Sequence, residues 1–134
     1  MNNIRVALAG FWGGFIDSQT GKIIPAYQEG YAPRDASFPR IIYQIVRPGY
    51  MDSVITNTSI WDRRPPEIGY HGLIDDVLEQ AALMIPGSGI LLSLGDDGSL
   101  WLQRSNPFFD YLNEPSDPTI TRGIIHVVVR NYVI

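Results

Sequence analysis

His71, Asp75 and Glu79 have the spacing most suggestive of chemistry. They recur every four residues, so on a helix they share one face, where an imidazole and two carboxylates can bind a divalent cation. No second motif completes a coordination shell, and a solvated helix face with acids near its N-terminus explains the same pattern. Residues 96–98 (DDG) could hold calcium, but the other calcium-loop ligands are missing, and a hairpin turn at residues 95–98 explains them. We therefore predict no metal and no cofactor.

The second histidine, His126, is the candidate general base. It lies within a run of β-branched residues, and neither a nucleophile nor an orienting carboxylate stands near it in the sequence. Residues 87–89 (GSG) lack the G-x-S-x-G spacing of a nucleophile elbow and indicate a turn. The favoured interpretation is a histidine satisfied within a sheet or an interface. We expect no catalytic residue and no enzymatic activity.

Acidic and aromatic side chains gather in residues 105–121, which their prolines mark as a loop. Asp110, Glu114 and Asp117 could supply the paired carboxylates of glycoside chemistry. Loops also carry most contacts with partners, and we favour a rim that meets another protein. The aromatic residues of this segment are Phe108, Phe109 and Tyr111.

Arginine supplies nearly all of the positive charge, since Lys22 is the only lysine. Arginine favours fixed, forked contacts of the kind found at interfaces. The opposite charges of residues 62–64 (DRR) and of Arg104 fit either surface ion pairs, worth about 0–1 kcal/mol, or pairing between subunits that fixes their register. We predict contacts from the loops at 47–52, 62–69 and 105–121. The individual residues predicted at an interface are Trp61, Asp62, Arg63, Arg64, Arg104, Phe108 and Phe109.

Composition narrows the class of protein. A chain of 134 residues with 45% hydrophobic and 18% charged residues predicts one domain, residues 1–134. Seven tyrosines, five phenylalanines and three tryptophans exceed the needs of a small core and indicate a surface that another molecule covers. Cysteine is absent, which excludes disulfides and thiolate sites. The net charge of −4 disfavours a dedicated nucleic-acid binder, and no apolar run approaches the ~20 residues of a membrane span.

Hydrophobic periodicity predicts two helices, one from the N-terminus to about Gly10 and one over residues 70–85. In the N-terminal segment, alternating apolar residues are also compatible with a strand. A short extended piece is predicted at 22–24, followed by a long loop at 25–39. Strands are predicted at residues 40–46, 53–61, 90–94, 99–104 and 124–133.

This order predicts an α+β domain with an antiparallel or mixed sheet of four to five strands. One main amphipathic helix packs on the sheet, joined by the N-terminal helix. The last strand is apolar on both sides, with Ile125 and Val127 on one side and Ile124 and Val128 on the other. We therefore expect the second face to be covered by the N-terminal segment or by a neighbouring subunit.

Several segments together resemble the tail terminator (tail completion) proteins of long-tailed bacteriophages. The resemblance covers about residues 37–134 and is one of element order and loose pattern, without a catalytic signature. The N-terminal third departs from it, because those proteins open with a cleaner helix than the glycines here permit. The segments that carry the resemblance are 37–43 (SFPRIIY), 53–61 (SVITNTSIW), 72–78 (GLIDDVL), 101–108 (WLQRSNPF) and the C-terminal strand.

The resemblance implies a structural virion protein, assembled in the host cytoplasm, that forms a six-fold ring on the tail tube. The ring stops tube elongation and offers a docking surface to the head connector. DNA passes through its lumen without specific binding, which a negative protein suits because cationic walls would retain phosphates. No membrane is involved. Two alternatives stay open: another head–tail joining, neck or tube protein of a phage, and a small α+β enzyme or ligand-binding domain that uses the acidic loop and a histidine.

Overall fold

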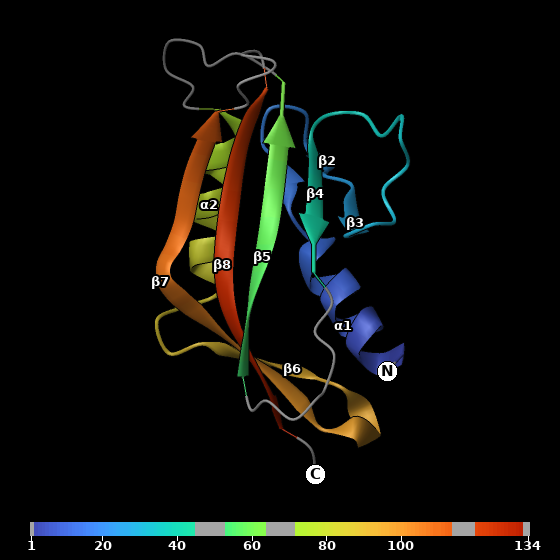
Figure 1. The fold of residues 1–134 in the computed structure, drawn as a ribbon, viewed down its shortest axis with the longest axis vertical. Helices are drawn as coiled ribbons and strands as arrows, with labels where there is room; N and C mark the ends of the chain where they lie inside the picture. The colour runs from blue at the N-terminus through green and yellow to red at the C-terminus, as the bar shows by residue number, and fades with distance from the viewer. Residues whose placement is uncertain (1, 45–52, 64–71, 114–119, 133–134) are drawn as a thin grey trace.

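The computed structural model describes residues 2–44, 53–63, 72–113 and 120–132. The predicted turn at 47–52 and most of the predicted loop at 62–69 lie outside these residues. Figure 1 shows the arrangement of the elements. In chain order they are α1 (Asn2–Trp12), β1 (Ile16–Asp17), β2 (Lys22–Ile23), β3 (Ala26–Gln28), β4 (Arg40–Tyr43), β5 (Ser53–Asp62), α2 (Leu73–Met84), β6 (Ile90–Ser93), a 3-10 turn (Gly95–Asp97), β7 (Ser99–Asn113) and β8 (Thr121–Tyr132).

The main sheet has six strands in the order β3-β4-β5-β8-β7-β6, and a separate pair is formed by β1 and β2. The prediction of an α+β domain with a mixed sheet is confirmed, but the strand count of four to five is too low. The additional strand is β3, inside the predicted loop 25–39, and it runs parallel to β4. The prolines of residues 25–39 lie outside β3, before and after the three paired residues. The Ile41 amide donates a hydrogen bond to the Pro25 carbonyl at 2.9 Å.

β7 corrects a second prediction, because the segment after Arg104 is a strand and not a loop. β7 pairs with β8 up to Arg104↔Val127, breaks register, and resumes at Phe109↔Ile125. Pro107 has no amide to donate, and the irregularity keeps it out of the ladder. The proline therefore marks a β-bulge, and the strand continues to Asn113.

Both helices pack on one face of the sheet. The apolar face predicted for the N-terminal helix is buried, and α1 runs to Trp12, slightly beyond the predicted end. The N-terminal segment therefore joins α2 on the same face. Of the two covers predicted for the second face, the N-terminal segment is wrong, and a neighbouring subunit stays a prediction. The largest fully buried side chains are Phe15, Leu8, Ile24, Ile41, Ile60, Leu73, Ile85, Leu100, Leu102, Ile125, Val77 and Val127.

A glycine on β8 lets α2 approach the sheet closely. Gly123 is buried beneath Ile74, and a Cβ atom at position 123 would lie 2.5 Å from the Ile74 Cγ2. Ile74 is β-branched, so its methyl group has few rotamers with which to move away. The absence of a side chain at 123 thus sets the distance between the helix and the sheet.

Candidate functional site on the open sheet face

No described helix packs on the side of the sheet opposite α1 and α2, which we call the open face (Figure 1). The segment at residues 29–34 borders part of it. Strand alternation decides which side chains reach it. Thr58, Ile60 and Ile125 point towards the helices and are buried, so their neighbours in the strands point to the open face. The open-face residues of the central strands include Arg40, Ile42, Asn57, Ser59, Trp61, Arg122, Ile124 and His126.

Arginines and aromatic rings alternate across this face. Strand register places Arg40 opposite Trp61, and Trp61 opposite Arg122. The Arg122 guanidinium carbon lies 4.5 Å from the Trp61 ring centroid, and that of Arg40 lies 6.0 Å from it. Arg40 also lies 4.4 Å from the ring of Phe38, which Arg63 approaches to 4.7 Å. We call the five residues the arginine–aromatic ladder; each such contact contributes about 0.5–1 kcal/mol at exposed positions.

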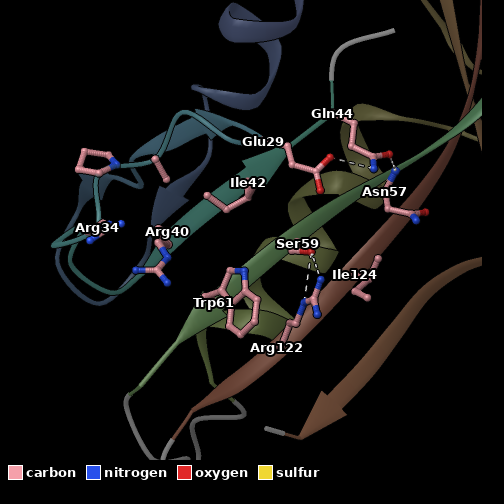
Figure 2. A pocket seen from close by; sticks show the side chains of 12 residues that line it. Glu29, Arg34, Arg40, Ile42, Gln44, Asn57, Ser59, Trp61, Arg122 and Ile124 are labelled. Carbon is pink, nitrogen blue, oxygen red and sulfur yellow. Dashed lines mark hydrogen bonds between the residues drawn. The ribbon is translucent and has the colours of Figure 1, made fainter.

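The ladder borders a hollow of about 480 Å³ on the open face. Arg34, Arg40, Arg122 and Glu29 line it, and Figure 2 shows Arg34 and Arg40 at the left, Arg122 at the lower right and Glu29 above them. Glu29 accepts a hydrogen bond of 3.1 Å from the Gln44 amide. The Gln44 carbonyl oxygen in turn accepts one of 2.8 Å from the backbone of residue 57. Three guanidinium groups thus face one carboxylate, and the hollow is positively charged within a protein whose net charge is −4.

Two arginines of the hollow, Arg40 and Arg122, donate hydrogen bonds to neutral groups. Arg122 donates from Nε and Nη2 to the Ser59 hydroxyl at 3.2 and 2.8 Å. Arg40 donates from Nη1 to the Ala36 carbonyl at 2.7 Å. Within the described ranges, neither guanidinium has a carboxylate within 4.0 Å. Guanidinium groups form strong forked hydrogen bonds with carboxylate and phosphate groups, so this arrangement can receive an anionic partner.

His126 lies on the same face, in a hydrogen-bonded row across three strands. Its Nδ1 is 2.7 Å from the Asn57 Oδ1, and its Nε2 is 2.7 Å from the Asp110 Oδ2. The sequence offered no orienting carboxylate, and the structure corrects this: the continuation of β7 brings Asp110 beside the histidine. Both ring nitrogens are engaged, which fits a histidine satisfied within the sheet. Base catalysis by His126 would first require one of these bonds to break.

Only some of the residues predicted to supply acidic or metal-binding groups lie within the described part of the chain. Asp110 lies on β7 and contacts His126, whereas Glu114 and Asp117 lie outside the described residues. His71 also lies outside them. Asp75 accepts a hydrogen bond from the Tyr111 hydroxyl. The part of the chain that the structure describes contains no group of three metal-ligating side chains.

The pKa of the Tyr111 hydroxyl is raised by its surroundings. Burial, the hydrogen bond to Asp75 and the negative charges of Asp75 and Glu79 raise the pKa of Tyr111 to about 12, from an ordinary value of 10.0. Each cause favours the neutral phenol over the phenolate. Tyr111 thereby ties β7 to the first turn of α2, on the side of the sheet away from the open face. The other predicted acidic segment, residues 96–98, overlaps the 3-10 turn Gly95–Asp97 of the β6–β7 hairpin, and the sequence had indicated a hairpin turn here.

The residues predicted at an interface are divided between the two sides of the sheet. Trp61 and Arg63 belong to the ladder on the open face. Asp62 is buried at 1% exposure on the helix side of β5, and its Oδ1 accepts the Arg63 amide at 2.9 Å. Arg64 lies outside the described residues.

The remaining predicted residues lie on β7 near its bulge. Arg104 donates from Nε to the Ile85 carbonyl and from Nη2 to the Ala82 carbonyl, both at 2.6 Å. Its guanidinium lies 5.1 Å from the ring of Phe108, and Phe109 is 41% exposed. Arg104 therefore binds the C-terminal end of α2 in its own chain. Sequence reasoning missed Arg40 and Arg122, which only the strand register brings to Trp61.

No protein-family model, curated protein or solved structure matches this chain. Among the described residues, neither helix has the length and apolar character needed to cross a membrane. The fold is that of an α+β protein with both helices on one face of a six-stranded mixed sheet. Its open face carries arginine and apolar side chains.

Proposed function

We propose that this chain is a ring-forming structural subunit of a phage virion, the tail terminator that caps the tail tube, stops its elongation and docks the head connector. The single observation that supports this is the open face. A sheet face that holds Trp61 and two guanidinium groups without carboxylate partners in the described chain resembles a protein interface more than a solvated surface. The resemblance of residues 37–134 to tail terminators supplies the identity of the assembly.

Exposed apolar side chains add to the same argument. Ile55 is 61% exposed and Leu112 is 43% exposed, and both are on the open face, opposite Val128 and Arg122 respectively. Burying apolar surface contributes about 25 cal/mol per Å². A neighbouring copy that covers these residues would recover free energy that the isolated subunit forgoes.

Ring closure has a geometric requirement that this chain can meet. A ring forms through heterologous contacts, in which one subunit presents two different and complementary surfaces. The open face and the helix side differ in chemistry, so they can serve as the two surfaces. The net charge of −4 suits a lumen through which DNA slides, because phosphates are not retained by a negative wall.

The experiment combines electron microscopy of the purified chain with a tube-elongation assay. We expect rings with a central hole, and shortened or capped tubes when the rings are added to a polymerising phage tail-tube protein. Rings that leave tube length unchanged would favour another head–tail joining or neck protein. A protein that stays monomeric and binds a small ligand in the hollow would contradict the proposal.

A further inference from the structure

The outer face of α2 differs in charge from the open face. The first turn of α2 carries Asp75 and Asp76, and no basic residue stands in its last turn. Glu79 is exposed and makes no hydrogen bond or ion pair with another described residue. Leu83, one turn further along, is 84% exposed. This helix therefore presents an acidic group and an apolar group, side by side, to the solvent.

The open face presents the complementary pair. The Arg122 guanidinium borders the hollow, and Ile124, two residues further along β8, lines it as well. Two residues of a strand span about 6.6–6.8 Å, and four residues of a helix span about 6 Å. The backbone spacing between Glu79 and Leu83 on α2 is thus close to that between Arg122 and Ile124 on β8.

We propose that the arginine–aromatic ladder is the docking site for the outer face of α2 from a second copy of this chain. Glu79 of the second copy pairs with the Arg122 guanidinium, and its Leu83 packs beside Ile124. This inference rests on the proposed function, because it names the two surfaces through which the ring would close. Charge complementarity carries it: the basic hollow is the counterpart of a helix face with three acids in five residues, 75 to 79.

The location of the two surfaces sets the symmetry of the contact. α2 packs on one face of the sheet, so its outer face and the open face lie on opposite sides of the subunit (Figure 1). A contact between different surfaces cannot be a two-fold contact; it repeats from copy to copy and ends only when the ring closes. The same docking gives a closed ring of identical subunits where the rotation from copy to copy closes, and an open filament where it does not.

The test uses two charge reversals, one on each surface. Glu79→Arg removes the acid from an exposed helix position, and Arg122→Glu reverses the charge in the hollow. Truncating or reversing one partner of a covered charge pair costs 2 kcal/mol or more, so we expect association at least about 30-fold weaker for each variant. Matched controls make the same charge changes away from the contact: Asp96→Arg at the hairpin tip, and Arg130→Glu on the same strand as Arg122.

Mixing the two variants gives the decisive result. Each variant alone should associate weakly, because every contact then brings like charges together. An equimolar mixture should associate, because one contact between the variants is the native charge pair and the next joins the two reversed charges. The combined variant Glu79→Arg/Arg122→Glu should regain part of the assembly. Circular dichroism checks that each variant folds. If Arg122→Glu does not fold, Arg122→Gln replaces it and is compared with Glu79→Arg in the same association measurements.

The possible failures are distinguishable. If the wild-type chain forms rings and both reversals leave them intact, the docking inference is overturned and the proposed function stands. If mixing the two variants restores no association, the pairing of these two surfaces is wrong. If the wild-type chain is monomeric at every concentration, the proposed function itself fails.

Discussion

Replacing Arg104 should destabilise the subunit itself, because the structure places its guanidinium against α2 of its own chain. Two hydrogen bonds of 2.6 Å reach the carbonyls of Ala82 and Ile85, where the helix dipole favours a cation. Hydrogen bonds from charged groups contribute about 1.5–3 kcal/mol each, and a cation at a helix C-terminus about 0.3–1 kcal/mol. Because Arg104 is exposed, we expect its contribution to lie near the lower end of these ranges. Arg104→Ala should therefore lower the free energy of unfolding by about 2 kcal/mol.

That loss should lower the melting temperature of a chain of 134 residues by about 6–10 °C. Arg104→Lys retains the charge without the fork and should lose about half as much. Arg104→Met keeps the apolar stem over Phe108 and separates packing from hydrogen bonding. Urea unfolding followed by circular dichroism gives the free energies, at one fixed protein concentration because assembly would add to stability.

Two outcomes would change the role assigned to Arg104. If Arg104→Ala leaves the free energy of unfolding unchanged while it abolishes association, then Arg104 contacts a neighbouring subunit, as its sequence context predicts, and the helix-capping interpretation fails. Equal losses in Arg104→Met and Arg104→Ala would locate the effect in the hydrogen bonds and exclude packing over Phe108 as its cause.

Further consequences concern the packing of α2. Gly123→Ala should destabilise the fold by about 1–3 kcal/mol, because its Cβ would lie 2.5 Å from a methyl of Ile74; Ile74→Ala in the same chain should recover part of that loss, and full additivity in a double-mutant cycle would refute the clash. Tyr111→Phe should change the pH dependence of stability in alkali. The raised pKa means that the folded state holds the phenolic proton more tightly than the unfolded state, so this contribution is complete below pH 10 and is lost as the pH rises to about 12. Urea unfolding across that range should show a steeper fall for the wild type than for the phenylalanine variant, and parallel curves would contradict the cause assigned here.

The sequence predicted most of the helices and strands because their apolar periodicity is strong. The α2 stripe and the alternation of β8 follow from burial on one or both sides, which local patterning reports directly. Prolines misled the interpretation in two places. β3 follows Pro25 and ends before Pro33, and β7 carries Pro107 within its bulge. Both strands exist because tertiary pairing tolerates a missing amide at an edge or an irregularity.

The candidate site was predictable only in part, for a reason of register. The types of Trp61 and Arg63 indicated an interface, and both lie in the ladder. Their partners Arg40 and Arg122 are remote from Trp61 in sequence, and only the pairing of β4, β5 and β8 brings them together. A shift of one residue in either pairing would turn them to the other face, and the sequence pattern does not specify register at that precision.

The central claim is that one copy of this chain is incomplete and closes with others through its open face. The mass of the wild-type protein in solution, measured by native mass spectrometry over a range of concentrations, tests this most directly. The account predicts one discrete species, a ring of six copies of the 15.0 kDa chain, with no open polymers. A single-chain mass at the highest concentrations would contradict it.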